Sequence, residues 1–347
     1  MSSPDWAAWA SIPWTPLTAS PDTTTITDTN NKTIGYHKHH VPYLPQSTPS
    51  PWQTLDVWIP PPSTGSPPPR NLIPSSANRP WLIFIHGGAW RDPFVTSSAF
   101  SSAALHILSS PTGPQIAGLA SLNYRLSPYP SHPTSPSPPS KPGATPDPAR
   151  LARHPDHIHD VLAGIGYLQR LGAASGPYVL AGHSCGATMA FQAAMDPSRW
   201  GLSPAICIAQ PAALVGLNGL YDLAGFIASP PAKYAGLRDA YAEFTCAAFG
   251  DDETAWRAAC PATADGWWPR EWDAGRERRR RVVLVQSCED SLVPRQQLES
   301  MRGYLEREEG VVEVLEMEAL GEHDGIWVSG ERMAQILLEV AAGLGQA

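Results

Sequence analysis

Short apolar runs alternate with helical patterns through most of the chain. The runs that have the length and composition of buried strands cover residues 81–85, 116–122, 178–181, 205–209, 282–286 and 311–317. A strand that is apolar on both of its faces is typical of a parallel sheet with helices above and below it. The sequence therefore predicts a mostly parallel central sheet.

Between these runs, apolar residues recur at the three- and four-residue spacing of an amphipathic helix. The clearest example begins at Pro155 and ends at Gly172, with Ile158, Val161 and Ile165 on one face. Further helices are expected at residues 187–195, 294–309 and 333–344. The alternation of strands and helices predicts an α/β fold with helices on both faces of the sheet.

Two proline-rich stretches interrupt this alternation, at residues 59–80 and 127–148. Proline has no backbone N–H and cannot contribute to a regular ladder of hydrogen bonds. Strand-like runs flank both stretches, so we expect surface insertions rather than linkers between domains. Because α/β folds of roughly 250 residues often form one unit, residues 1–347 are expected to form a single domain.

Composition narrows the classes of function. Charged residues make up 16% of the chain and the formal net charge is -8, which argues against a nucleic-acid partner. The five cysteines lack the spacing of a disulfide framework or of a metal site. The first residues lack the basic and apolar regions of a signal peptide, and no apolar run is long enough to cross a membrane. We therefore expect a cytoplasmic protein without a membrane partner.

A Gly-x-Ser-x-Gly motif lies between a predicted strand and a predicted helix. It extends from Gly182 to Gly186, with Ser184 at its centre, directly after the run at 178–181. Such a motif is a nucleophile elbow, a sharp turn that exposes the serine hydroxyl and requires glycines on either side. The combination of strand, turn and helix favours Ser184 as the nucleophile of an α/β-hydrolase fold over a glycine-rich helix start without chemistry.

An HGG-type loop, residues 86–90 (HGGAW), directly follows the first apolar run. In α/β-hydrolases, such a loop and the residue after the nucleophile donate backbone N–H groups to the oxyanion of the tetrahedral intermediate. Gly87, Gly88 and Cys185 are the expected donors. His86 is an alternative catalytic base, but the chain order in this fold favours a histidine near the C-terminus.

The other two members of a catalytic triad are expected on loops that follow later strands. Asp290 comes after the strand predicted at 282–286, and strand ends of this kind carry catalytic groups in open α/β sheets. Glu289 and Asp222 are alternative acids. His323 lies between the last predicted strand and the last predicted helix, where the order nucleophile, acid, histidine requires the base.

Other polar clusters have simpler interpretations. The histidines of residues 154–159 (HPDHIH) surround a helix start that Asp156 can cap, which we favour over a metal site. The three histidines of residues 37–40 are expected in a polar surface turn. The arginine-rich run at 276–281 precedes a strand in an acidic protein, which is typical of a solvated loop rather than of a nucleic-acid patch.

Several of these motifs occur together in one family of enzymes. They are HGGAW at 86–90, NYRLSPYPSHP at 123–133, HPDHIHDV at 154–161, GHSCGATMA at 182–190, EDSLVP at 289–294 and GEHDGIW at 321–327. In this combination the chain resembles kynurenine formamidases (arylformamidases), particularly the fungal ones, from Trp81 to the last helix. The resemblance implies the α/β-hydrolase fold and hydrolysis of N-formyl-L-kynurenine to L-kynurenine and formate in tryptophan catabolism.

The resemblance also implies a site. Ser184, Asp290 and His323 match the triad and residues 86–90 match the oxyanion loop, whose last residue, Trp90, is the expected substrate contact. No cofactor and no metal are implied, and the partner is the small-molecule substrate; a homodimer is compatible with the sequence. The proline-rich insertions depart from the family pattern, so the resemblance does not predict how the pocket is capped.

The chemistry of these residues predicts the reaction. Ser184 attacks the formyl carbon, and His323 transfers the proton to the departing aryl amine before water hydrolyses the formyl-enzyme. Two other functions remain open. The same triad would serve a general carboxylesterase, and a non-catalytic ligand receptor can use a hydrolase scaffold because fold does not determine function.

Overall fold

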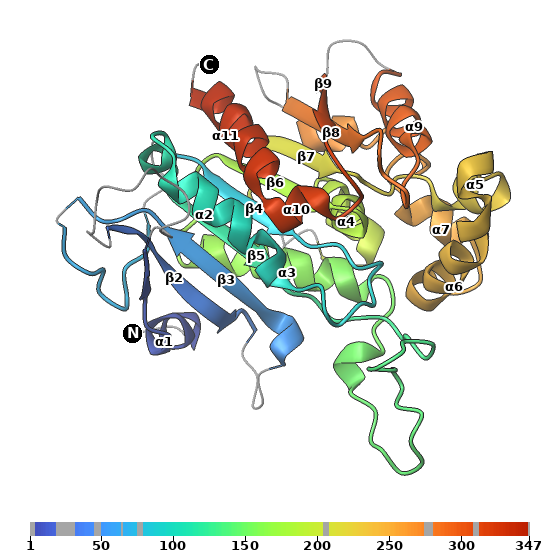
Figure 1. Cartoon of the computed structure of the whole chain (residues 1–347), viewed down its shortest axis with the longest axis horizontal. Coiled ribbons are helices and arrows are strands. Elements are labelled where there is room, and N and C mark those ends of the chain that lie inside the picture. Colours follow the sequence, from blue (N-terminus) through green and yellow to red (C-terminus); the bar gives the residue numbers. More distant parts are fainter. Residues whose placement is uncertain are drawn as a thin grey trace.

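One mixed sheet forms the centre of the molecule (Figure 1). The computed structural model describes residues 4–18, 32–44, 50–63, 65–74, 79–203, 208–273, 280–307 and 312–345. Within them the strand order is β1-β2-β3-β5-β4-β6-β7-β8-β9. The strands are β1 (Thr15–Thr18), β2 (Thr33–Pro42), β3 (Thr54–Ile59), β4 (Trp81–Ile85), β5 (Gly118–Leu122), β6 (Tyr178–His183), β7 (Ala213–Leu217), β8 (Arg280–Ser287) and β9 (Val312–Ala319).

The sheet has a parallel and an antiparallel part. Strands β4 to β9 pair in parallel, whereas β1, β2 and β3 pair antiparallel and β3 joins β5 antiparallel. The helices are α1 (Pro4–Ser11), α2 (Ser101–Ser109), α3 (Asp156–Arg170), α4 (Cys185–Gln192), α5 (Leu223–Ala228), α6 (Arg238–Phe249), α7 (Glu253–Ala259), α8 (Pro269–Asp273), α9 (Arg295–Leu305), α10 (Gly325–Ser329) and α11 (Glu331–Gly345). The predicted helices are present, with ends shifted by a few residues. Among the described helices, none has the length and apolarity to cross a membrane.

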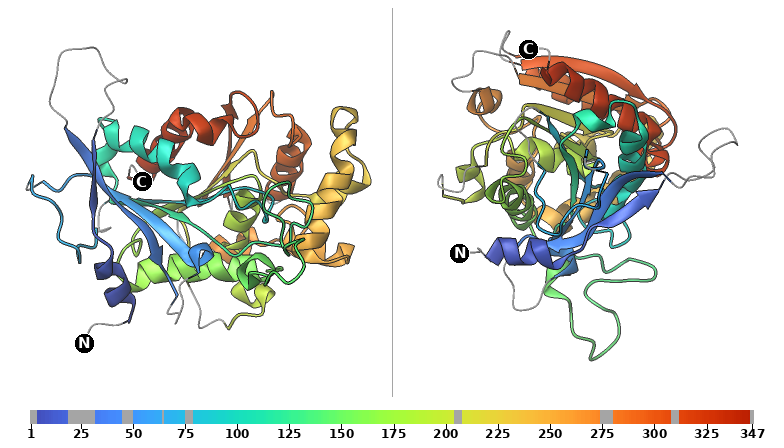
Figure 2. Two further views of the ribbon diagram at one scale, coloured as in Figure 1. Left: turned by 60° about the horizontal axis from the view of Figure 1, so that its bottom comes forward. Right: turned by 90° about the vertical axis from the view of Figure 1, so that its left-hand side faces the viewer.

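Helices cover both faces of the sheet (Figures 1 and 2). Leu82 and Phe84 of β4 share one buried cluster with α2 and α11, while Ile83 and Ile85 share another with α3, α4 and α9. Successive side chains of a strand point to opposite faces, so an apolar strand such as β4 requires a helical layer on each side. The predicted fold class, a mostly parallel sheet with helices on both faces, is confirmed.

The sequence of helix α3 determines both its buried face and the point where it ends. Its residues Ile158, Val161 and Ile165 are buried on one face, and burying a side chain of this size contributes about 1.5–3 kcal/mol. The helix ends at Arg170 because Gly172 adopts a φ of 89°, a left-handed conformation that glycine tolerates. Asp156 does not cap it, since the first turn has no side-chain cap.

The strand expected at residues 205–209 does not complete the sheet. Residues 204–207 lie outside the described part of the chain, and the rest of that run is not in a strand. Strand β7 lies between β6 and β8 instead. Two apolar runs separated by Pro211 compete for this position, and apolarity alone does not distinguish them. The run at 276–281 also lies mostly outside the described residues, and its end begins β8.

The three histidines of residues 37–40 belong to β2, so the expected surface turn is wrong. His37 is buried, and its ring stacks on Trp58 of β3 with 4.4 Å between ring centroids. The register of β2 against β3 shifts next to these residues, and His40 adopts a φ of 51°. This β-bulge exposes two of the three histidines, which gives the segment the polar pattern of a turn.

The second proline-rich insertion forms a long loop that projects from the molecule (Figure 1). An antiparallel bridge between Tyr129 and Ser137 closes part of it, and Arg150 donates a hydrogen bond to the carbonyl of Ser135 at 2.7 Å. Its first residues pack against the rest of the protein, where the buried side chain of Ser127 contacts His157. The base of the insertion is therefore attached to the molecule by polar contacts.

Candidate active site

Ser184 lies in the turn between β6 and α4. Its backbone has φ 54° and ψ -122°, an uncommon conformation for a residue other than glycine. A Cβ atom on Gly182 would overlap the carbonyl of Gly186, and one on Gly186 would overlap the carbonyl of Ile85. Both glycines of the motif are therefore required for the close approach of strand and helix. Leu217 of the neighbouring strand holds the turn by accepting a hydrogen bond from the N–H of Ser184 at 2.9 Å.

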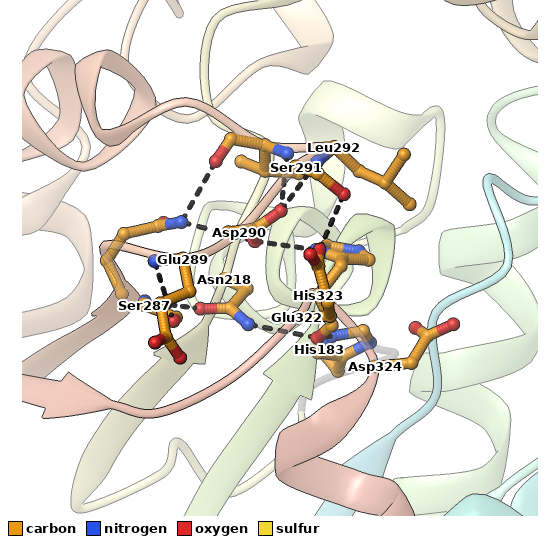
Figure 3. Close-up of polar contacts among 12 residues, drawn as sticks. His183, Asn218, Ser287, Glu289, Asp290, Ser291, Leu292, Glu322, His323 and Asp324 are labelled. Carbon is orange, nitrogen blue, oxygen red and sulfur yellow. Dashed lines mark hydrogen bonds and ion pairs between the residues drawn. The ribbon is translucent and has the colours of Figure 1, made fainter.

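His323 and Asp290 are in direct contact (Figure 3). Nδ1 of His323 lies 2.8 Å from Oδ2 of Asp290, and the carboxylate is fully buried. The other oxygen, Oδ1, accepts hydrogen bonds from the N–H groups of Leu292 and Val293, both at 2.8 Å. Because an ionised carboxylate accepts hydrogen bonds but cannot donate them, this contact places the proton of the neutral imidazole on Nδ1. Nε2 is then left as a proton acceptor.

Two buried side chains hold the backbone at His323 (Figure 3). Nε2 of His183 and Nδ2 of Asn218 each donate to the carbonyl oxygen of His323 at 3.0 Å. Burial and the neighbouring His323 lower the pKa of His183 well below its usual value, so this histidine is neutral. Asn218 also accepts a hydrogen bond from the N–H of Ser287 at 3.0 Å, which links the loops after β7, β8 and β9. The roles of His183 and Asn218 carry no sequence signal, because their partners are backbone groups distant in the chain.

The alternative acids have other contacts. Oε2 of Glu289 accepts a hydrogen bond from the N–H of Gly321 at 2.6 Å, which ties the loop after β8 to the loop that carries His323. Oδ1 of Asp222 accepts from the N–H of Gly225 at 2.8 Å and caps helix α5. In the described structure neither carboxylate contacts the imidazole of His323.

The loop at 86–90 is tied to the nucleophile turn by the side chain of Cys185. Its sulfur accepts a hydrogen bond from the N–H of Trp90 at 3.3 Å and lies 3.7 Å from the hydroxyl of Tyr124. The same hydroxyl lies 3.0 Å and 2.9 Å from the carbonyl oxygens of His86 and Gly87. Burial raises the pKa of the Cys185 thiol to about 11, so the sulfur is neutral. The sequence indicated only a backbone role for Cys185.

His86 supports the turn rather than facing the nucleophile. The ring is buried, stacks on Tyr124 with 4.4 Å between centroids, and its Nδ1 donates to the carbonyl of Gly87 at 2.9 Å. Burial lowers its pKa to about 4, so it is neutral at pH 7. Gly88 follows with a φ of 94°, which suits glycine.

A cavity of about 230 Å³ lies over these groups, and Ser184 and His323 both line it. Of the three expected oxyanion donors, Gly88 is in its wall, whereas Gly87 and Cys185 are not. This volume is somewhat below the range of about 300–1,000 Å³ that is common for ligand pockets, which favours a small substrate.

The outer wall of the cavity comes from segments that the sequence did not connect with the site. Tyr129, from the second proline-rich insertion, and Tyr241 and Phe244, from α6, line it. Trp90 does not: it is buried behind the loop, with its ring centroid 5.0 Å from that of Phe249. Aromatic residues in the insertions have no motif, so only the fold shows that they meet at the cavity.

Two groups among the described residues bring possible metal ligands together. They are His183 with His323 and Asp324, and His37 with His39 and Asp56, and within each group the ligand atoms lie within 4.8 Å of one another. The histidines of 154–159 have separate partners instead. Nε2 of His157 contacts Ser127 at 2.9 Å, and Nε2 of His159 contacts the carbonyl of Trp200 at 2.7 Å.

Comparison with known proteins identifies relatives. Residues 82–335 match the family model described as the alpha/beta hydrolase family. A kynurenine formamidase-like hydrolase of Fusarium equiseti is 38% identical over 86% of this chain and 92% of its own length. A kynurenine formamidase of Aspergillus versicolor is 32% identical over 83% of this chain and 94% of its own length. Esterase B of Lactobacillus rhamnosis has a similar fold, with a TM-score of 0.60 and 14% identity over 90% of this chain and 87% of its own.

Proposed function

Because this chain belongs to the alpha/beta hydrolase family and is related to fungal kynurenine formamidases, we propose that it hydrolyses N-formyl-L-kynurenine to L-kynurenine and formate. The observation that carries the proposal is the 2.8 Å contact between His323 and Asp290 beside a cavity that Ser184 also lines. The relationship to the formamidases supplies the class of substrate. The catalytic triad in this proposal is Ser184, Asp290 and His323.

In the first half of the reaction, Ser184 Oγ attacks the formyl carbon while Nε2 of His323 takes the hydroxyl proton. Backbone N–H groups of Gly88 and Cys185, with Gly87 as a third donor, stabilise the negative oxygen of the tetrahedral intermediate. Asp290 keeps the imidazole in the reactive tautomer and stabilises the imidazolium. When the C–N bond breaks, His323 gives its proton to the departing aryl amine, and L-kynurenine leaves.

In the second half, the formyl group remains as an ester on Ser184. His323, neutral again, takes a proton from a water molecule that attacks this ester. The second tetrahedral intermediate breaks at the bond to Ser184 Oγ, which recovers its proton from His323 as formate leaves. An aryl amine is a better leaving group than an alkyl amine, so esterase machinery suffices for this amide.

The test compares substrates. We expect purified protein to hydrolyse N-formyl-L-kynurenine with a kcat/KM well above that for short p-nitrophenyl esters. Hydrolysis of the esters with no activity on N-formyl-L-kynurenine would contradict the proposal and indicate a carboxylesterase. Binding of aryl formamides without hydrolysis of any of these compounds would indicate a ligand receptor instead.

A further inference from the structure

A buried arginine side chain, that of Arg91, lies in the wall of the cavity. Only 7% of the Arg91 side chain is exposed, yet Arg91 lines the cavity together with Ser184 and His323. Its guanidinium carbon lies 3.9 Å from the ring centroid of Tyr129 and 5.9 Å from that of Phe244. Aromatic rings at such distances attract a guanidinium and fix its orientation. The two aromatic residues therefore hold the charge at the cavity wall.

The hydrogen-bond donors of Arg91 are only partly used among the described residues. Its carboxylate neighbour, Glu243, is 43% exposed and also accepts a hydrogen bond from the Ser131 hydroxyl at 2.6 Å. Nη2 of Arg91 donates to Glu243 at 3.4 Å, a long hydrogen bond. Nη1 lies 3.1 Å from the same carboxylate but is buried without a hydrogen bond among the described residues. A guanidinium has five N–H donors, so Arg91 has donors left for an anion.

The next residue presents the opposite charge to the same cavity. Asp92 lines it, and one of its carboxylate oxygens accepts a hydrogen bond from the N–H of Phe94 at 2.8 Å. The N–H groups of Arg91 and Asp92 both donate to the carbonyl of Gly88, at 2.9 Å and 2.8 Å. One turn therefore carries the oxyanion donor Gly88 and a pair of opposite charges, which gives the two features a fixed separation.

We propose that Arg91 and Asp92 form a subsite for the α-amino-acid end of the substrate, in which Arg91 binds the carboxylate and Asp92 the ammonium group. The inference rests on the proposed function and specifies how its substrate is selected. N-formyl-L-kynurenine is an aryl formamide whose side chain ends in an amino-acid zwitterion. Bidentate pairing of a guanidinium with a carboxylate is directional, so it orients the whole molecule. The aromatic walls formed by Tyr129, Tyr241 and Phe244 then contact its ring.

The competing interpretation is that Arg91 only joins the loop to helix α6 through Glu243. The two interpretations differ in which substrates respond to a substitution. An arginine that binds the substrate carboxylate matters only for substrates that have one. A structural ion pair affects every substrate alike, and loss of either partner, Arg91 or Glu243, has the same effect.

The experiment compares N-formyl-L-kynurenine with ortho-formamidoacetophenone, which keeps the aryl formamide and the ketone but lacks the amino-acid group. Arg91→Met keeps an unbranched apolar side chain but removes the guanidinium. We expect it to lower the ratio of the two kcat/KM values about 10- to 100-fold, mainly through KM, as expected for loss of a hydrogen-bonded charge pair. Arg91→Lys keeps the charge without the bidentate geometry and should lower the ratio less. Glu243→Gln is the matched control and should leave the ratio unchanged or raise it.

The desamino analogue of N-formyl-L-kynurenine separates the two charges. Arg91→Met should still impair its hydrolysis, whereas Asp92→Asn should impair only the substrate that carries the ammonium group. An unchanged ratio in both Arg91 variants, or an equal loss in Arg91→Met and Glu243→Gln on both substrates, would overturn the subsite.

Failure of the proposed function gives a different result. In that event the wild type hydrolyses the neutral formamide or esters but not N-formyl-L-kynurenine. In that case, binding of L-kynurenine to the Ser184→Ala protein tests the subsite independently of hydrolysis. We expect Arg91→Met to weaken this binding about tenfold or more. Equal binding with and without Arg91, or no binding of L-kynurenine to the Ser184→Ala protein, would overturn the inference.

Discussion

Nδ1 of His323 lies 2.8 Å from Oδ2 of Asp290, although 33 residues separate the two in the chain. The carboxylate has no exposed surface, and two backbone N–H groups of its own loop hold its other oxygen. The position of the carboxylate is therefore held by its own loop as well as by the histidine. On this relationship we base the proposal that Asp290 orients His323.

Asp290→Asn should lower kcat by about 10⁴-fold with little change in KM, because the amide would stabilise the wrong imidazole tautomer. Glu289→Gln and Asp222→Asn should be mild, since their contacts are to the N–H groups of Gly321 and Gly225. Steady-state kinetics on all three variants, with folding checked by circular dichroism, measures this. A large loss of kcat in Glu289→Gln, together with a nearly normal kcat in Asp290→Asn, would show that Glu289 orients the histidine instead.

Asn218 is expected to act as a positioning residue for His323. Asn218→Asp keeps the shape but replaces the N–H donor that faces the carbonyl of His323, so kcat should fall about tenfold while KM changes little. Asn218→Gly is the control for backbone strain. Asn218 has a φ of 46°, which glycine adopts readily, so this variant removes the side chain without straining the turn. If both variants lower only thermal stability and leave kcat and its pH profile unchanged, Asn218 has a structural role alone.

The burial of Cys185 predicts which residue a covalent inhibitor modifies. A thiol whose pKa is raised to about 11 is almost entirely protonated at pH 7, and the thiolate is the reactive form. Serine-directed organophosphates or sulfonyl fluorides should therefore inactivate the enzyme and modify Ser184, whereas EDTA should have no effect. Peptide mass spectrometry locates the adduct. Modification of Cys185, or loss of activity with EDTA, would be incompatible with a metal-independent serine mechanism.

Acid should destabilise the protein through buried histidines. Burial is the largest cause of a lowered pKa at five of them, namely His183 (well below its usual value), His37 (about 3), His86 (about 4), His154 (about 4) and His157 (about 3). Such a histidine stays neutral in the folded protein but gains a proton in the unfolded chain below its ordinary pKa of about 6.5. Its stabilising contribution is therefore complete above that pH and is lost as the pH falls toward the lowered pKa. Each such group should lower the free energy of unfolding by up to about 1.4 kcal/mol per pH unit below pH 6.

Urea denaturation at pH 7 and pH 5 measures this dependence. His157→Gln, which keeps a hydrogen-bonding side chain near Ser127, should reduce the difference in the free energy of unfolding between the two pH values. A free energy of unfolding that is the same at both pH values in the wild type would contradict the neutral, buried state of these histidines.

The parallel part of the fold could be predicted because its signals are local, and the proposed triad rests on signals of the same kind. An apolar run followed by a glycine-flanked serine, or by an acid or a histidine in chain order, is visible without knowledge of the rest of the structure. The antiparallel strands could not be predicted in this way. The ring of His37 in strand β2 is buried against Trp58 of β3, and the bulge of this strand gives the histidines of 37–40 the pattern of a turn.

The walls of the cavity depend on contacts between distant segments. Tyr129 lies in a proline-rich insertion and Phe244 in α6, and the guanidinium of Arg91 lies close to the rings of both. The sulfur of Cys185 similarly joins two motifs that the sequence presents separately. Such relationships carry no periodicity or motif, so they became visible only in the folded chain.

The proposed nucleophile is tested most directly by the activity of Ser184→Ala on N-formyl-L-kynurenine, compared with the wild type at equal concentration and with folding verified by circular dichroism. We predict that the wild type releases L-kynurenine and formate in equal amounts, and that the variant loses nearly all of kcat, by about 10⁴-fold or more. Retention of more than about a tenth of the wild-type kcat by a folded Ser184→Ala protein would contradict the serine mechanism.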